Sequence, residues 1–209
     1  KLDKVRWRRI ASGLHQALGL KVVDDRIYVL GRDQLTRLHD LNGDGEIDFY
    51  ECFSNAFVTS TGGHDYICGL ERNSEGHFYT ASCKQGVLRI SADGTKADVL
   101  ATGLRNPNGI GLYPDGAVTV PSSEGDWVPA SLIGLVKNST ARIPHFGYMG
   151  PTNGQAPDLP LVYLPRGMDN WSGGQVHVSS DRWGPLKDRM IHFSHGAGCH
   201  FLLLRDEVD

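Results

Sequence analysis

The sequence predicts an all-β fold, and more specifically a β-propeller of which this chain covers about four blades. A unit made of a strand, a tight turn and a second strand recurs along the chain. The units begin at Gly19, Gly69, Gly111 and Gly173. The first two steps, of 50 and 42 residues, match the roughly 40–50 residues of a four-stranded blade, and the third, of 62 residues, implies an insertion. The 26 glycines and 10 prolines among 209 residues also suit a turn-rich β protein.

Each unit has turn residues between two apolar runs, which is the pattern of a β-hairpin. In the third unit, GIGLYPDG precedes the run AVTV, and Gly116 supplies the positive φ angle that the turn requires. In the first unit the apolar runs flank Asp24 and Asp25. Four hairpins in a β-sandwich are the less favoured alternative. The predicted blades lie near residues 13–60, 61–104, 105–166 and 167–209.

The third blade contains an insertion near residues 137–166 that is rich in proline and glycine. Long loops without periodicity are usually functional or disordered, and the aromatic residues of this one favour order, so we expect an ordered excursion between blades. The chain starts without Met and ends in LLLRDEVD, which we interpret as the edge of an unfinished blade. Because propellers close to remove exposed edge strands, we expect the chain to be part of a larger propeller.

Composition excludes several classes of function. A net charge of −3 provides no basic surface for nucleic acid, and no apolar run reaches the roughly 18 residues of a membrane span. The cysteines form no CxxC pair. Cys68 and Cys83 lie on the two strands of one predicted hairpin, so either a disulfide or two buried thiols is compatible with the sequence.

Residues 40–51, DLNGDGEIDFYE, match every position of an EF-hand-type calcium loop. Gly45 occupies the sharp turn, and the flanking residues favour strands over helices, which indicates a structural calcium site and not a sensor. An acidic turn at a hairpin tip is the alternative. The predicted oxygen ligands are Asp40, Asn42, Asp44, the backbone carbonyl of Glu46, Asp48 and Glu51.

Candidate binding residues stand just before the hairpins, in loops at one rim of the predicted propeller, where binding groups concentrate. Arg105 and Asn106 precede the third hairpin, and Arg166, Asp169 and Asn170 precede the last. His64 precedes the second hairpin, and its neutral imidazole can accept a proton from a hydroxyl. A structural histidine is the alternative. Glu124 lies on a further loop that either lines this site or forms a turn.

Three histidines cluster in HFSHGAGCH near the end of the chain. His and Cys are common ligands of transition metals. However, the alternation in IHF and HFLLL places these histidines on the faces of strands, and this interpretation is favoured.

The motifs LHDLNGDGE, GLRNPNG and PRG…D…GGQ…DRWGPL occur in this order, and His64 stands between the first two. From about residue 12 onward this pattern resembles the quinoprotein glucose/sorbosone dehydrogenase propellers, most closely the planctomycete-type membrane-bound dehydrogenase-like proteins. The resemblance implies six blades, pyrroloquinoline quinone (PQQ) as cofactor, and a periplasmic or extracellular location with membrane association. It also implies that His64 takes the proton of the sugar hydroxyl and that Arg105 and Asn106 contact the quinone.

Two functions follow from these observations. The first is a PQQ-dependent sugar or alcohol dehydrogenase-like propeller with a structural calcium site, whose electrons pass to a cytochrome or haem domain. The alternative is a non-catalytic propeller that binds protein or glycan in a cell-envelope assembly. One observation separates the two functions. The dehydrogenase requires His64, Arg105 and Asp169 to converge on one channel mouth with room for a planar ligand, whereas bulky side chains filling that space would favour the non-catalytic propeller.

Overall fold

The computed structural model describes residues 4–63, 65–137 and 142–205. It confirms the predicted fold class, because the chain forms four antiparallel sheets. The first sheet contains β1 (Gly19–Val23), β2 (Arg26–Leu30), β3 (Leu35–His39) and β4 (Phe49–Ser54). The second contains β5 (Ile67–Arg72), β6 (Phe78–Ser82), β7 (Gly86–Ile90) and β8 (Ala97–Ala101). The third contains β9 (Gly111–Leu112), β10 (Val118–Ser122), β11 (Ser131–Val136) and β12 (Val162–Leu164). The fourth contains β13 (Ser172–His177), β14 (Met190–Ser194) and β15 (Cys199–Leu203).

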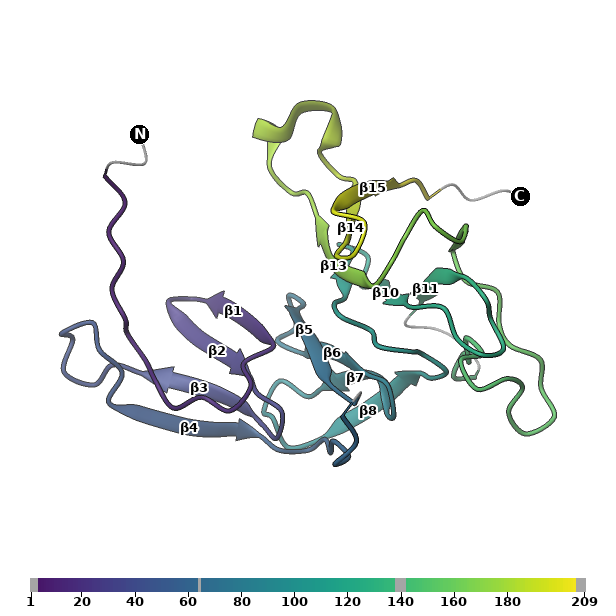
Figure 1. Ribbon diagram of the computed structural model, residues 1–209. Helices are drawn as coiled ribbons and strands as arrows, with labels where there is room; N and C mark the ends of the chain where they lie inside the picture. The colour runs from purple at the N-terminus through teal and green to yellow at the C-terminus, as the bar shows by residue number, and fades with distance from the viewer. Residues whose placement is uncertain (1–3, 64, 138–141, 206–209) are drawn as a thin grey trace.

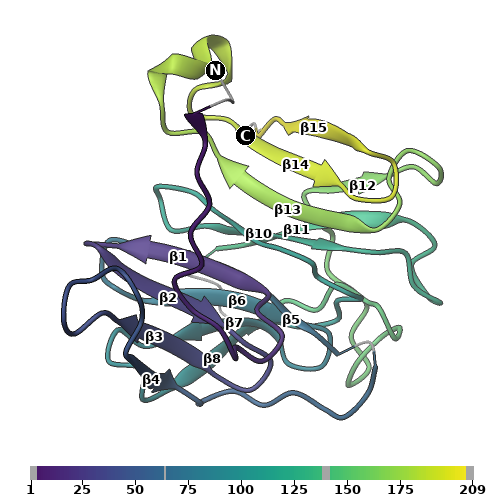
Figure 2. The same ribbon diagram turned by 60° about the vertical axis from the view of Figure 1, so that its left-hand side comes forward.

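Within each sheet the strands are hydrogen-bonded in chain order, which makes each sheet a meander. The sheets follow one another along an arc with the first and fourth at its ends (Figures 1 and 2). The first strand of each sheet is the inner one: β1 lies against β5, β5 against β9, and β9 against β13. This is the arrangement of consecutive blades in a propeller.

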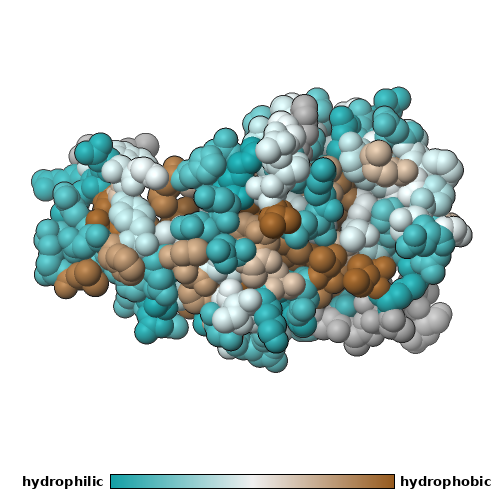
Figure 3. Space-filling view, turned by 90° about the horizontal axis from the view of Figure 1, so that it is seen from below, coloured by the Kyte–Doolittle hydropathy of each residue, from teal (hydrophilic) through white to brown (hydrophobic). Residues whose placement is uncertain are grey.

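Apolar side chains fill the spaces between neighbouring sheets. Tyr28 of β2 packs on Phe78 of β6 with ring centroids 4.7 Å apart, and this contact belongs to the core between the first and second sheets. Phe146 belongs to the core between the second and third sheets. Ile133 and Met190 belong to the smaller core between the third and fourth. On the face seen from below, apolar side chains also gather in several surface patches (Figure 3).

The predicted hairpins form where the sequence offers residues that readily adopt the positive φ angles of a tight turn. Val23 pairs with Arg26, which leaves Asp24 and Asp25 as a two-residue loop with φ angles of 48° and 59°. Positive φ at both central residues is the type I′ geometry, whose twist matches that of the strands it joins. In the second sheet, Gly86 begins β7 with φ 85°, and a Cβ there would lie 1.8 Å from the carbonyl oxygen of Ala101.

Two connections differ from the sequence expectation. The insertion joins β11 to β12, so it lies within the third sheet and not between blades. It folds back onto the neighbouring blade, because the Phe146 N–H donates to the Thr102 carbonyl at 2.9 Å. The second difference is that the last unit lacks the expected tight turn. The 3-10 helix η2 (Asp181–Leu186) lies between β13 and β14 instead. The strands expected in IHF and HFLLL are confirmed as β14 and β15.

The connections of a meander alternate between its two ends, so this fold has two rims. The β1–β2, β3–β4 and β13–β14 connections share one rim. The β2–β3, β10–β11 and β14–β15 connections share the other, together with the segments that lead from one sheet to the next. The β3–β4 loop lies at the left of Figure 2, the β13–β14 connection lies at the top, and the β14–β15 turn lies at the right. The predicted calcium loop and the Arg105 loop are therefore on opposite rims.

Candidate functional site

Three loops on one rim enclose a pocket of about 230 Å³ between the third and fourth blades. They are the segment before β9, the β10–β11 connection and the segment before β13. The side chains considered below are Arg105, Asn106, Ser123, Glu124, Asp169, Asn170 and Trp171. The pocket thus brings together two residues of the predicted quinone contact and three more that the sequence placed on rim loops.

The loop that carries Arg105 is fixed to the end of β10. The Arg105 N–H donates to the Ser122 hydroxyl at 2.8 Å, and the Ser123 N–H donates to the Arg105 carbonyl at 2.9 Å. The Arg105 guanidinium donates to the Glu124 carbonyl through Nη1. Asn106 has a φ angle of 45°, which turns the chain directly after the arginine. The guanidinium is therefore held at the pocket by backbone contacts and is not free to swing.

The floor of the pocket is polar and closed to solvent. Neither the Asp169 nor the His192 side chain is exposed, and Asp169 Oδ1 lies 3.8 Å from His192 Nε2. The other oxygen, Asp169 Oδ2, accepts a hydrogen bond from the Ser172 hydroxyl at 2.9 Å. Burial lowers the pKa of His192, and the nearby Asp169 carboxylate opposes that shift.

Several buried polar atoms at this floor have no hydrogen-bond partner among the described residues. They are Ser123 Oγ, Asp169 Oδ1 and both ring nitrogens of His192. Most buried polar groups in proteins are hydrogen-bonded. A cluster of exceptions below a pocket marks this part of the molecule as a place where further polar groups or water belong.

The sequence-predicted base, His64, lies outside the described residues. Its neighbour Asp65 is buried, and its carboxylate accepts hydrogen bonds from the N–H groups of Ser60 at 2.8 Å and Lys84 at 3.1 Å. Arg32 Nη2 donates to the Ser60 carbonyl at 2.8 Å. Asp65 and Arg32 therefore anchor this rim loop to the two neighbouring connections, and the Asp65 oxygens are engaged by backbone groups.

Trp171 and Ser123 are pocket residues that the sequence analysis missed. Trp171 directly follows Asn170, so it lies in the same segment before β13 whose position made Asp169 and Asn170 candidates. No sequence signal identified Ser123, because its role depends on how the end of β10 meets the Arg105 loop.

In the β3–β4 loop the acidic side chains cap backbone N–H groups. Asp40 accepts from Gly43 and Gly45, each at 2.7 Å, and Asp48 accepts from Leu41 at 2.8 Å. Gly45 has the positive φ angle, 82°, expected at the sharp turn.

Glu51 lies on β4, where its Oε2 is 2.6 Å from Arg37 Nη2 and 2.6 Å from His39 Nε2. Burial raises its pKa, but the hydrogen bonds from His39 and Arg37 outweigh this, so the pKa of Glu51 is lowered. Within the described ranges, no three His, Cys, Asp or Glu side chains are grouped so that they could hold a metal ion. The calcium site stays a prediction.

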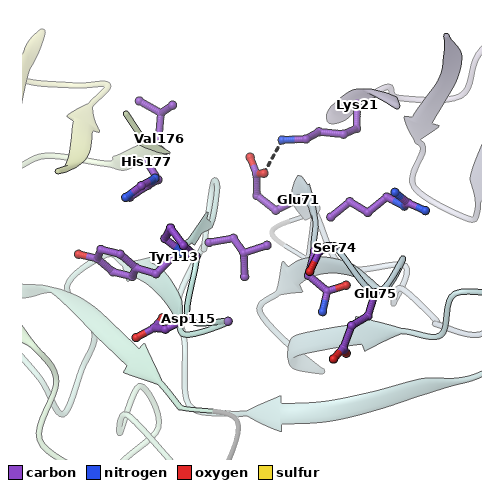
Figure 4. Close-up of a pocket in the computed structure, with 13 residues that line it drawn as sticks. Lys21, Glu71, Ser74, Glu75, Tyr113, Asp115, Val176 and His177 are labelled. Atoms are coloured by element: carbon purple, nitrogen blue, oxygen red, sulfur yellow. Dashed lines mark hydrogen bonds and ion pairs between the residues drawn. The ribbon is translucent and has the colours of Figure 1, made fainter. Parts of the chain in front are cut away.

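A second pocket, of about 520 Å³, opens on the opposite rim at the ends of the inner strands (Figure 4). Lys21 of β1 and Glu71 of β5 form an ion pair across it. Tyr113 faces His177 with ring centroids 5.6 Å apart. Lys21 and Glu71 neutralise each other and tie the first blade to the second.

All four cysteines are free thiols in this structure, so Cys68 and Cys83 do not form a disulfide. None of the helical segments in the described part of the chain has the length and apolar character of a membrane span.

Comparison with solved structures finds the same architecture at low sequence identity. A Thermus thermophilus protein named as an oxidoreductase (glucose dehydrogenase) has a TM-score of 0.55 at 12% identity, over 96% of this chain and 83% of its own. The soluble aldose sugar dehydrogenase of Escherichia coli has a TM-score of 0.63 at 13% identity, over 89% of this chain and 69% of its own. A Trichoderma reesei protein of Carbohydrate-Active Enzymes Family AA12 has a TM-score of 0.53 at 14% identity, over 84% and 65%.

No protein-family model matches the sequence, and comparison with curated proteins gives no significant match. At identities this low, structural likeness establishes the fold and not the activity. The chain therefore has a partial β-propeller fold like that of these sugar dehydrogenases.

Proposed function

We propose that this chain is part of a PQQ-dependent sugar or alcohol dehydrogenase-like propeller. The observation that carries the proposal is the rim pocket, in which Arg105 and Asn106 meet the segment before β13. Two further points support it: the motif resemblance assigns the quinone contact to the same two residues, and the fold is that of sugar dehydrogenases.

The hydrogen-bond donors present fit one edge of an oxygen-rich cofactor, and the carboxylates of Glu124 and Asp169 line the same pocket beside them. Arg105 offers a guanidinium, Asn106 and Asn170 offer amides, and Ser123 Oγ is a buried hydroxyl with no partner among the described residues. The pocket is smaller than the roughly 300–1,000 Å³ of pockets that enclose drug-sized ligands, so it forms one part of such a site.

PQQ, when bound, supplies a two-electron acceptor for the oxidation of a hydroxyl-bearing carbon. In this proposal Arg105 and Asn106 bind and orient the cofactor through its oxygens. His64 holds the proton that the substrate hydroxyl loses, and Asp65 and Arg32 position the loop that leads to it.

The proposal includes calcium at residues 40–51 as a stabiliser of the β3–β4 loop, away from the chemistry on the other rim. It also includes a small sugar or alcohol as substrate, a cytochrome or haem domain as electron acceptor, and a periplasmic or extracellular location with membrane association. The motif resemblance supports each of these.

The test is a titration of the protein with PQQ in millimolar calcium, followed by absorbance and then by dye reduction with a panel of sugars. We expect saturable binding that Arg105→Ala weakens by about tenfold or more, because a hydrogen bond to a charged group is lost. Arg182→Ala, on the exposed η2 segment, is the matched control and should bind as the wild type does.

His64→Ala should keep the binding and lose the dye reduction. If PQQ does not bind, or binds equally well to Arg105→Ala, the assignment of this pocket is wrong.

A further inference from the structure

A buried acid–base pair lies below the rim pocket, and the proposed function does not use it. Neither the Asp169 nor the His192 side chain has any exposed surface, and Asp169 Oδ1 faces His192 Nε2 at 3.8 Å. Buried polar groups are normally hydrogen-bonded. Asp169 Oδ1 and both ring nitrogens of His192 have no such partner in the part of the chain that the structure describes. The facing atoms of the two groups are therefore available to a third group.

Neighbouring residues hold this pair in place. The Ser172 hydroxyl donates to Asp169 Oδ2 at 2.9 Å, so the carboxylate keeps its other oxygen, Oδ1, toward the imidazole. His192 lies on β14, the central strand of the fourth sheet in Figure 2, and its ring stacks on Phe201 of β15 with ring centroids 6.1 Å apart. The 3.8 Å separation is thus set by the fold, and the two groups do not close to a direct hydrogen bond.

A separation of 3.8 Å is too long for a hydrogen bond, but it suits one bridging water molecule. Water has two hydrogens to donate, and Asp169 Oδ1 and a ring nitrogen of His192 are two acceptors. Gln175 on β13 is the register partner of His192, so the two side chains share one face of the fourth sheet. Gln175 is 7% exposed, and its amide oxygen and nitrogen have no partner within the described residues. The surroundings of His192 are therefore polar on several sides, which is the condition for an ordered internal water.

The pair adjoins the rim pocket. Asp169 lines that pocket together with Ser123, whose buried hydroxyl also has no partner in the described ranges. Ser123 follows β10 in the third blade and Asp169 precedes β13 in the fourth, so the unpartnered atoms form a series from the pocket wall through Asp169 to His192. Met190, two residues before His192 on the same face of β14, belongs to an apolar core. The pocket is therefore the polar side of the imidazole.

The electrostatics of the pair suit the uptake of a proton. Burial lowers the pKa of His192, so the resting ring is neutral and able to accept. Asp169 is the charged group that acts on it, and the side chains that flank it on β13 and β15, Gln175 and Phe201, carry no charge. A proton on Nε2 creates an imidazolium beside the carboxylate, and buried opposite charges compensate each other when they are hydrogen-bonded.

The other ionisable groups at the pocket are engaged or open to solvent. The Glu124 carboxylate lies 3.3 Å from Nε of Arg166, and its side chain is 46% exposed, so a proton there is shared with bulk water. The Arg105 guanidinium is already cationic and donates to the Glu124 carbonyl. Asp169 and His192 are thus the buried pair at which a proton from the pocket can be held.

We propose that Asp169 and His192 hold a proton for the rim pocket, to which internal water connects them past Ser123. An O–H bond of the bridging water breaks, and an N–H bond forms at His192 Nε2 beside the carboxylate. Oxidation of a hydroxyl to a carbonyl releases two protons and two electrons. In the proposed function the electrons pass to the acceptor domain and His64 takes the hydroxyl proton, which leaves the second proton for His192. The use of the pair in turnover rests on the proposed function, whereas its connection to the pocket does not.

Hydrogen exchange in the ligand-free protein tests the water connection. In nitrogen-15 NMR, the His192 ring signals are those that disappear in His192→Gln. We expect the ring N–H of His192 to have a protection factor about tenfold or more below that of the Ile191 backbone N–H, which lies on the same strand and is also buried. Internal water reaches the ring without unfolding, whereas a core amide exchanges when its strand opens. Equal protection of the two groups would overturn the proposal, because His192 would then be sealed from the pocket.

Two serine variants test the route. Ser123→Val places an apolar group at the pocket wall and should raise the protection factor of the His192 ring N–H, relative to Ile191, by about tenfold, because water is then excluded from that wall. Ser82→Val is the matched control, since Ser82 is a buried serine at the end of β6 in the second sheet, and it should leave this ratio unchanged. Equal effects of the two variants would overturn the route past Ser123.

Turnover tests whether the pair is used. In the dye-reduction assay, His192→Gln should bind PQQ as the wild type does and lower kcat by about tenfold or more with KM unchanged, since it can no longer hold the proton. Its pH profile of kcat should also lose the inflection at the pH where the His192 NMR signal titrates in the wild type. An unchanged pH profile would overturn the proton-holding role.

The failure of this inference is distinguishable from the failure of the proposed function. A wild type that neither binds PQQ nor reduces the dye would refute the proposed function and, with it, the use of His192 in turnover. The exchange measurement on the ligand-free wild type would still decide whether water connects the pair to the pocket. Thermal unfolding of each variant shows whether it retains the fold, and the wild-type comparison of His192 with Ile191 stands whatever the variants do.

Discussion

Asp169 and His192 face each other below the rim pocket, and both side chains are closed to solvent. Burying an ionisable group is costly unless it is paired or remains neutral. Burial lowers the pKa of His192, so the folded protein favours the neutral imidazole. The pair therefore links the stability of the fourth blade to pH.

We expect stability to fall as the pH drops below about 6.5, the ordinary pKa of histidine. Below that pH the unfolded chain binds a proton at His192 that the folded chain resists, and stability rises with pH wherever the unfolded state binds more protons. Each pKa unit by which folding lowers the pKa of a group corresponds to about 1.4 kcal/mol of unfolding free energy. His192→Gln should therefore lose less stability between pH 7.5 and pH 5 in urea unfolding than the wild type does.

His15→Gln is the control, because His15 is exposed and lies 3.6 Å from the exposed Asp33. Its pH dependence should follow that of the wild type. Equal behaviour of the two variants would contradict a special role for His192.

Among the structural elements, the β3–β4 loop has the strongest sequence signal but still lacks a demonstrated ligand. Its carboxylates already cap backbone N–H groups, and Glu51 is paired with Arg37 and His39 on β3. For calcium to gain its last ligand, Glu51 must leave these partners. Exposed or half-exposed ion pairs contribute only about 0–1 kcal/mol, so a divalent ion can compete with them.

We expect calcium to raise the thermal unfolding midpoint of the wild type, because binding to the folded state alone stabilises it by about 2.7 kcal/mol at 100 times Kd. Glu51→Gln should lose most of this gain. Glu46→Gln should retain it, because position 7 of such a loop offers a backbone carbonyl. A wild-type midpoint that does not respond to millimolar calcium would show that the loop is an ordinary acidic turn.

Elements with strong local chemistry were predictable from the sequence. The hairpin at Asp24 and Asp25 depends on residues that tolerate positive φ, and this requirement is visible without a structure. The path of the insertion was not predictable, because β12 has only three residues and follows several prolines, which leaves no periodicity to read. The floor of the candidate site was not predictable either, because His192 reaches Asp169 only through the packing of β14 against the segment before β13.

On the scale of the whole molecule, the first and last sheets each carry apolar side chains on a lateral face. In the first sheet, Leu20 and Val22 of β1 are exposed. In the last, Phe193 is 45% exposed and Leu202 43% exposed, and they share one face because Leu202 pairs with Ile191, two residues from Phe193. Such faces promote association when nothing covers them.

We expect the isolated chain to self-associate as its concentration rises, which sedimentation velocity would detect. The double variant Phe193→Ser, Leu202→Ser should associate less, with only a small change in unfolding midpoint because both side chains are already partly exposed. Leu159→Ser is the control, since Leu159 is 84% exposed but lies in the insertion and not on the fourth sheet. Unchanged association in the double variant would mean that this face is not involved.

The meander order of every sheet has a consequence for biosynthesis. Each hydrogen-bonded pair of strands is adjacent in the sequence, so no strand must wait for a partner from a distant part of the chain. Domains are synthesised at about 5–20 residues per second, and local contacts form much faster than that. Each blade can therefore close as it leaves the ribosome and pack on its predecessor, so the growing end of the nascent chain exposes only the blade most recently completed.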